Sequence, residues 1–226
     1  MARRTRSEIR AEISAVLDRL EATYGKTPYT VRFEPMDELV SCILSQHTSD
    51  ANSFPAFARL RKAFPTWAGI VKAGPERIEH VIRSAGLANQ KSKAIVKVLK
   101  EIKARNGEYE IENLRDMPLM EARKWLESLP SVGPKTSSIV LCFSFGMPAI
   151  PVDTHIYRVS KRLGVLSEKT DANKSHDVLL ELIAPKDAFR YHTSLIQHGR
   201  RICRARRPRC GECPVFDFCR WKDKAK

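Results

Sequence analysis

Four cysteines stand close together near the end of the 226-residue chain, at Cys203, Cys210, Cys213 and Cys219. Thiolates gathered in so short a segment usually hold a metal centre. Only one pair has the C-x2-C spacing, whereas a zinc ribbon places two such pairs on separate tight turns. Four thiolates in one cage suit a [4Fe-4S] cluster at least as well as zinc. We therefore expect a [4Fe-4S] cluster as the cofactor, with a zinc ion or two disulfides as the alternatives.

A second segment that could do chemistry reads L-P-S-V-G-P-K-T over residues 129–136 and leads into an apolar helix. A turn at Gly133, followed by Pro134 in the first helical position, leaves several backbone N–H groups unpaired and pointing outward. Those donors and the positive end of the helix dipole form a natural phosphate site beside Lys135. An ordinary helix N-terminus with an exposed lysine is the alternative.

A carboxylate follows in the segment P-V-D-T-H at residues 151–155, which opens the next predicted helix. Aspartate is a preferred residue immediately before a helix, because its side chain accepts a hydrogen bond from the first turn. Capping alone would therefore account for Asp153.

The chain carries 40 lysine and arginine residues against 26 aspartate and glutamate residues, a formal net charge of +14. Such an excess attracts polyanions and gives salt-sensitive affinity for nucleic acid. One basic group surrounds the first two cysteines, at Arg200, Arg201, Arg204, Arg206, Arg207 and Arg209. A second group follows helical spacing and is interpreted as one solvated helix face: Lys91, Lys93, Lys97, Lys100 and Lys103. The charge favours a nucleic-acid partner, and a merely solvated basic surface is the alternative.

No apolar run approaches the roughly 20 residues that a membrane-spanning helix needs. The basic segment at residues 1–6 is not followed directly by an apolar stretch, so a secretory signal is not expected. Cys42 and Cys142 lie within apolar stretches and are interpreted as small buried hydrophobic residues. We therefore expect a cytoplasmic protein in a reducing compartment, where disulfides are rare.

Apolar residues recur with helical spacing along nearly the whole chain, and no stretch shows the sustained period-two alternation of a strand. Ser7 is expected to cap a first helix that ends at Gly25. Further helices are predicted at residues 36–47, 50–63, 66–72, 75–84, 89–105, 120–128, 134–145, 153–163, 171–183 and 187–203. The fold class is therefore expected to be all-α.

Taken together, these motifs resemble the endonuclease III branch of the helix-hairpin-helix DNA glycosylase superfamily. The resemblance rests on the segments at 129–136 and 151–159, on I-Q-H-G-R at 196–200 and on the four-cysteine spacing. It implies two helical lobes with a cleft between them. One lobe, residues 28–147, ends in the helix-hairpin-helix, and the other joins residues 1–27 to the cluster-bearing residues 148–226.

The resemblance further implies a bifunctional DNA glycosylase and AP lyase of base excision repair that removes oxidised pyrimidines. The partner is double-stranded DNA containing damaged bases or abasic sites, bound by a monomer. The nucleophilic lysine of the family falls on Lys135, and its catalytic aspartate falls on Asp153. A lysine amine attacks only in its unprotonated form. The Asp153 carboxylate would stabilise positive charge that develops on the sugar.

An enzyme that acts on a base takes the nucleotide out of the stack, and the family fills the gap with residues of two loops, here 44–50 and 85–89. By this resemblance Leu87 is the apolar wedge. Gln46 stands one place earlier than in the family pattern and His47 occupies the plugging position, so either could pair with the orphaned base. Further DNA contacts are expected at Ser131, Val132, Gly133, Arg204, Arg206 and Arg207.

Three residues near the motifs have two explanations each. The family has glycine at the position of Ser131, and a positive φ there would strain a serine. Glu127 matches an acidic residue that lines the base pocket in the family, although a plain helix-surface glutamate explains it nearly as well. His155 is given a supporting role, since capping or packing would also account for it.

The cluster is expected to fold the C-terminal tail and to hold the loop at 204–209 against DNA phosphates. Two other functions stay open on the sequence. One is a related glycosylase with a different lesion or mismatch preference, and the other is a damage-binding paralogue with little activity.

Overall fold

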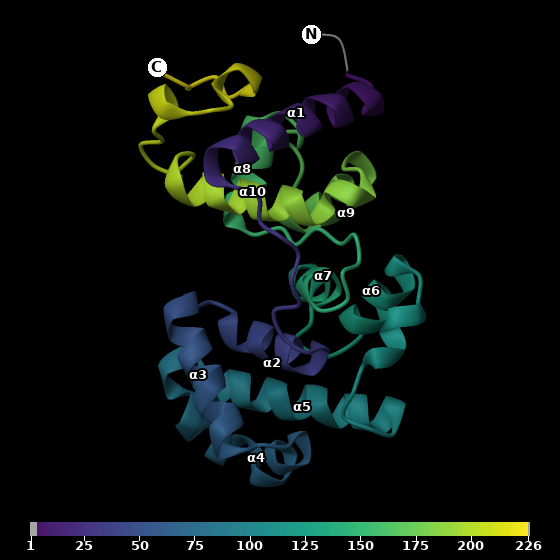
Figure 1. Ribbon diagram of the computed structural model, residues 1–226. Helices are drawn as coiled ribbons and strands as arrows, with labels where there is room; N and C mark the ends of the chain where they lie inside the picture. Colours follow the sequence, from purple (N-terminus) through teal and green to yellow (C-terminus); the bar gives the residue numbers. More distant parts are fainter. Residues whose placement is uncertain (1–3, 226) are drawn as a thin grey trace. The chain divides into compact units, whose positions relative to one another are not determined.

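The computed structural model describes residues 4–225, and every regular element in that range is an α-helix or a short 3-10 helix (Figure 1). The expected all-α class is confirmed. The chain forms two compact units: Val31–Met147 make one, and the residues up to Thr30 make the other with those from Pro148 onward. No helix in the described range is both long and apolar enough to cross a bilayer.

The unit of residues 31–147 is built from α2 (Pro35–Ser45), α3 (Asp50–Ala63), α4 (Trp67–Ile82), η1 (Arg83–Ala85), α5 (Ala88–Asn106), η2 (Glu112–Asp116), α6 (Leu119–Glu127) and α7 (Pro134–Phe143). Helix α2 packs against α3, α5 and α7, and α6 pairs with α7. Leu39, Ile43, Leu60 and Leu99 are fully buried between these helices. Gly74, with a φ of 78°, breaks α4 at the point where two separate helices were predicted.

The other unit is built from α1 (Arg6–Tyr24), α8 (Thr154–Arg162), α9 (Ala172–Leu182), η3 (Pro185–Asp187), α10 (Ala188–Arg201), η4 (Cys210–Glu212) and η5 (Phe216–Phe218). Its core joins apolar residues of α1, such as Leu17 and Leu20, to those of α8, α9 and α10. Tyr191 is fully buried there, and its hydroxyl lies 2.7 Å from that of Ser160. This packing explains why the N-terminal helix belongs with the C-terminal part of the chain.

The first helix begins two residues earlier than the expected cap at Ser7 would allow. Thr5 is the N-cap: its hydroxyl accepts a hydrogen bond from the Glu8 N–H, and the Glu8 carboxylate accepts one from the Thr5 N–H. A reciprocal capping box satisfies two N–H groups at once, which a cap at Ser7 would not do. The predicted end of this helix at Gly25 is confirmed.

The interpretation of five lysines as one solvated face of α5 is wrong for its first member. Lys93, Lys97, Lys100 and Lys103 are exposed or partly exposed, but Lys91 is only 4% exposed. Its ammonium donates hydrogen bonds to two backbone carbonyl oxygens. Helical spacing places a residue on a face, but it does not decide which neighbouring segment covers the end of that face.

Candidate active site and metal centre

The hairpin between α6 and α7 has the geometry expected of an anion site. Gly133 is the N-cap of α7, provides no side-chain cap, and is followed by Pro134 in the first turn. The first-turn N–H groups of a helix have no carbonyl partner within the helix, so here they are offered to a ligand. Lys135 is exposed in that same turn. A phosphate placed there would meet both the N–H groups and the positive end of the helix dipole.

Lys135 shares a cavity of about 650 Å³ with the loop that follows α2. Gln46, His47, Thr48 and Ser49 line this cavity from the loop. The Gln46 side-chain amide donates a hydrogen bond to the Ser131 carbonyl at 3.0 Å, which ties the loop to the hairpin. The structure therefore brings together the predicted nucleophile and both candidates for contact with the orphaned base.

Cys42 also lines this cavity, but it is not a second nucleophile. Its side chain is buried, and burial raises the pKa of the thiol well above its ordinary value. A thiol that stays protonated is a poor nucleophile. The interpretation of Cys42 as a small buried hydrophobic residue agrees with this environment.

Several residues that are predicted to contact DNA have an unusual backbone conformation. Among the described residues, the non-glycine positions with positive φ are His47 (54°), Leu87 (49°), Ser131 (65°) and Arg207 (49°). Residues in this region are strained, and such residues cluster at functional sites where the surrounding structure holds them in place. All four belong to the set for which the sequence predicts DNA contact.

The predicted wedge is presented to solvent. Leu87 is 50% exposed and sits in the left-handed conformation as the N-cap of α5, where it provides no side-chain cap. A large apolar side chain is an unfavourable N-cap, and its exposure has no stabilising role within the unit. Both features fit a side chain held ready to enter a base stack.

Val132 and Glu127 are less exposed than their neighbour Lys135. Val132 is only 6% exposed, and its contact with DNA stays a prediction. Glu127 accepts hydrogen bonds from Arg123 Nε at 2.7 Å and from the Ser137 hydroxyl at 2.9 Å. The Arg123 bond lies within α6, and the Ser137 bond joins α6 to α7, so Glu127 helps to hold the two helices of the hairpin together. Its side chain is partly exposed, and its place in the base pocket stays a prediction.

In the other unit, Asp153 is the N-cap of α8, and its Oδ1 accepts a hydrogen bond from the Ile156 N–H at 2.8 Å. His155 Nδ1 lies 3.2 Å from Nη2 of Arg158, and its Cβ lies against Gly199 of α10. His155 therefore packs α8 against α10. The pairing of Asp153 with Lys135 stays a prediction.

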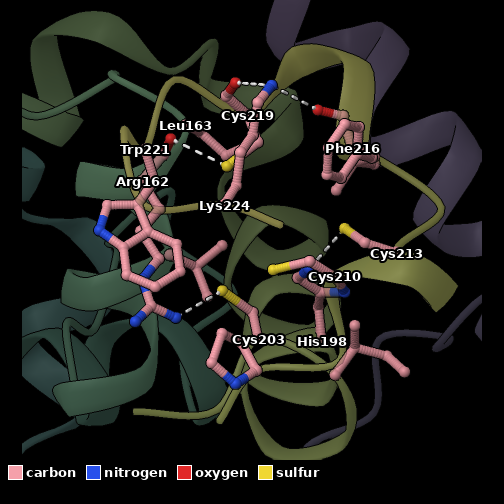
Figure 2. Close-up of a pocket in the computed structure, with 14 residues that line it drawn as sticks. Arg162, Leu163, His198, Cys203, Cys210, Cys213, Phe216, Cys219, Trp221 and Lys224 are labelled. Atoms are coloured by element: carbon pink, nitrogen blue, oxygen red, sulfur yellow. Dashed lines mark hydrogen bonds between the residues drawn. The ribbon is translucent and has the colours of Figure 1, made fainter. Parts of the chain in front are cut away.

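The four C-terminal cysteines line one cavity (Figure 2). All four are free thiols in the structure. Apolar residues such as Val159, Leu163 and Val215 surround them. Within residues 4–225, no three His, Cys, Asp or Glu side chains are grouped so as to hold a single metal ion. Four cysteine thiolates are the donor set that holds a [4Fe-4S] cluster, and the four side chains meet in this cavity.

Side chains that the sequence analysis missed contact these thiols. Arg162 Nη1 lies 3.3 Å from Cys203 Sγ, and His198 Nε2 lies 3.6 Å from Cys213 Sγ (Figure 2). Arg158 adds a hydrogen bond from Nε to the Cys203 carbonyl at 2.9 Å. The spacing of the two arginines on α8 was a usable signal, because residues four apart lie on one face of a helix.

The arginine loop after α10 is fixed by its backbone while its side chains project outward. Arg162 Nη1 donates to the Arg204 carbonyl at 2.8 Å, and the Arg209 N–H donates to the Ile202 carbonyl. Arg209 pairs with Glu212. Arg204, Arg206 and Arg207 are exposed, and no ion pair among the described residues engages them, so they are available to phosphates.

Comparison with known proteins identifies the class. The HhH-GPD superfamily of base excision DNA repair proteins matches residues 40–185, and the iron-sulfur binding domain of endonuclease III matches residues 203–219. The chain therefore belongs to the HhH-GPD superfamily. This membership confirms the predicted class of enzyme, a DNA glycosylase and AP lyase of base excision repair. It also confirms the predicted [4Fe-4S] cofactor.

Within this superfamily, the chain is similar to several endonuclease III proteins. The chain is 35% identical to endonuclease III of Escherichia coli strain K12 over 191 residues, which cover 84% of this chain and 85% of the relative. It is 37% identical to endonuclease III of Rickettsia prowazekii over 81% of this chain and 82% of the relative. A trapped endonuclease III–DNA covalent intermediate superposes with a TM-score of 0.80 at 31% identity, covering 96% and 97% of the two chains.

Proposed function

We propose that this repair enzyme removes oxidised pyrimidines from duplex DNA and acts in the cytoplasm on the DNA of the nucleoid. Lys135 is its nucleophile, and Asp153 is the carboxylate that assists the lysine. One observation carries the proposal. Lys135 is exposed in the first turn of α7 and shares its cavity with Gln46 and His47. The covalent protein–DNA intermediate trapped with a similar endonuclease III supports a nucleophile on the protein.

The reaction begins with the neutral amine of Lys135. Its nitrogen bonds to C1′ of the extruded nucleotide, while the C1′–base bond breaks and the base leaves with the electron pair; the proton that the amine loses passes by way of Asp153 to the departing base. The carboxylate of Asp153 stabilises positive charge on the sugar and accepts the proton that the attacking amine loses. Ring opening then gives an imine between Lys135 and C1′.

The imine makes the second activity possible. As an electron sink it acidifies the C2′–H bond, so a base removes that proton and the 3′ phosphate leaves with the electrons of the C3′–O bond. The phosphate is held while this happens by the free N–H groups at the start of α7. Hydrolysis of the imine returns the lysine.

The groups around the chemistry have binding roles. Leu87 would enter the stack, and Gln46 or His47 would face the orphaned base, since each offers a donor and an acceptor. When bound, the [4Fe-4S] cluster supplies four iron–thiolate bonds that close the tail. Arg158 and Arg162 then hold the arginine loop through its backbone carbonyls, with Arg204, Arg206 and Arg207 directed at phosphates.

Borohydride trapping tests the nucleophile, because reduction of the imine leaves a permanent bond between protein and DNA. We expect wild-type protein to be trapped on duplexes that contain an abasic site or thymine glycol, and Lys135→Ala to give no trapped product. Lys124→Ala, an exposed lysine of α6, is the matched control and should trap at the wild-type rate. Trapping that survives in Lys135→Ala would reject the assignment.

A panel of defined lesions separates the proposed substrate from the alternatives. Faster excision of ring-saturated pyrimidines than of mismatched or alkylated bases supports the proposal. A preference for a mismatch would place the enzyme with relatives of other specificity. Tight lesion binding without any trapped product would identify a damage-binding protein.

A further inference from the structure

A buried lysine connects the two loops to which DNA contacts are assigned. The ammonium of Lys91, a residue that is 4% exposed, donates hydrogen bonds to the carbonyl of Leu44 and to the carbonyl of Ala85, each at 2.7 Å. The backbone N–H of Lys91 donates to the carbonyl of Leu87 at 3.0 Å. One residue thus holds three carbonyls that come from two separate segments.

The site offers the Lys91 amine two hydrogen-bond acceptors and the negative end of a helix dipole, against the cost of burial. Leu44 lies in the last turn of α2, and the last carbonyls of a helix lack partners within it and carry the negative end of the helix dipole. Burying a charged amine is costly unless it is hydrogen-bonded, and burial lowers the pKa of Lys91. A neutral amine still has two N–H groups, so both carbonyls keep a donor in either protonation state.

Each carbonyl held by the Lys91 ammonium lies shortly before a strained residue. Ala85 lies two positions before Leu87, whose φ is 49°, and Leu44 lies three positions before His47, whose φ is 54°. Strained backbone persists only where the surrounding structure fixes it. The bonds from Lys91 supply that restraint at the start of both loops.

We propose that Lys91 is a positioning residue that sets the two gap-filling loops at a fixed separation, so that Leu87 and the Gln46–His47 pair enter the duplex together. The inference rests on the proposed function. Lys91 itself is buried and does not touch the substrate. Loss of its bonds should leave the phosphate contacts and the nucleophile in place while the loops lose their common register.

Loss of the Lys91 bonds should affect binding to damaged DNA more than binding to undamaged DNA. Binding to undamaged duplex depends on phosphate contacts with basic groups, none of which Lys91 makes. Binding at an abasic site also needs the wedge and the plug in register. A change at Lys91 should therefore weaken lesion binding and spare undamaged binding, whereas partial unfolding would weaken both by the same factor.

The test compares Lys91→Met with Lys93→Met, an exposed neighbour on α5 that removes the same charge. Dissociation constants are measured for duplexes with and without a tetrahydrofuran abasic analogue, with 2-aminopurine opposite the analogue to report contact with the orphaned base. We expect Lys91→Met to lose lesion affinity by about tenfold, which is about 1.4 kcal/mol of binding free energy, with a reduced 2-aminopurine response. Undamaged binding should match that of Lys93→Met.

Two further variants keep the outcome decisive. Lys91→Gln retains two N–H donors and should recover part of the lost selectivity, and it replaces Lys91→Met if that variant does not fold. In a Leu87→Ala background, Lys91→Met should cause a smaller loss of lesion affinity than it does in the wild-type protein, because the effects of residues that act through one another are not additive. Unchanged selectivity in Lys91→Met, with wild-type protein still trapped by borohydride, overturns the role of Lys91 and leaves the proposed function standing.

Discussion

Replacing Ser131 by glycine should stabilise the protein, although removing a side chain usually does the reverse. Ser131 is exposed and has a φ of 65°, where an L-residue with a Cβ pays about 1–2 kcal/mol. Glycine adopts this region without that cost, but it raises the entropy of the unfolded chain by about 0.4–1 kcal/mol. Taken at the middle of both ranges, the balance is a gain of about 0.8 kcal/mol in the free energy of unfolding.

Thermal unfolding followed by tryptophan fluorescence measures this gain, because Trp67 and Trp125 lie in the same unit as the hairpin. A gain of that size raises the Tm by about 1–4 °C in a chain of this length. Gln46 bonds to the carbonyl of residue 131, which glycine also has. Trapping on abasic DNA should therefore stay at the wild-type level.

Ser7→Gly is the control, because Ser7 is also exposed but lies in the regular helix α1. Glycine is a poorer helix former than serine by roughly 0.5 kcal/mol, so this variant should lower the Tm. A fall in Tm for Ser131→Gly, similar in size to that of Ser7→Gly, would refute the argument that backbone strain is stored at the hairpin.

Three further predictions concern the cluster-bearing unit. A Cβ added at Gly199 would lie 2.8 Å from the Cβ of His155, so Gly199→Ala should cost about 1–3 kcal/mol through overpacking and lower the Tm. A rise in Tm, as expected for Gly→Ala at an uncrowded position in a helix, would contradict this contact. Cys210→Ser should reduce the iron content below the about four atoms per chain of an intact cluster, and full iron retention by elemental analysis would remove Cys210 from the ligand set. Arg206→Ala combined with Arg207→Ala should flatten the log–log salt dependence of DNA binding by about 0.9 for each phosphate that the protein no longer neutralises, and an unchanged slope would mean that neither arginine binds a phosphate.

Local physics explains why much of the protein could be predicted from its sequence. The cap at Asp153, the helix start at Pro134 and the helix end at Gly25 depend on residues within one turn of each other. The error at the first cap has the same origin. Ser7 and Thr5 are both good capping residues, and the reciprocal bond with Glu8 decided between them.

The backbone conformation of Ser131 explains why the family has glycine at this position. The pattern has glycine there, and the structure gives that position a φ of 65°. His47 and Leu87 have the same type of backbone, but no glycine marked them in advance. Their conformation depends on the segments that hold the loops, including the contacts of Lys91.

By itself, the sequence determined the class of the protein, the four-cysteine segment and the lysine at the helix start, because these depend on residue type and short spacing. Only the tertiary structure decided which segments meet. Lys91 reaches a carbonyl 47 residues away, Gln46 reaches one 85 residues away, and Arg162 and His198 come to lie against the thiols of the C-terminal tail. Such contacts arise when whole helices bury their apolar faces against one another, and spacing along the chain does not specify which polar side chains that packing brings together.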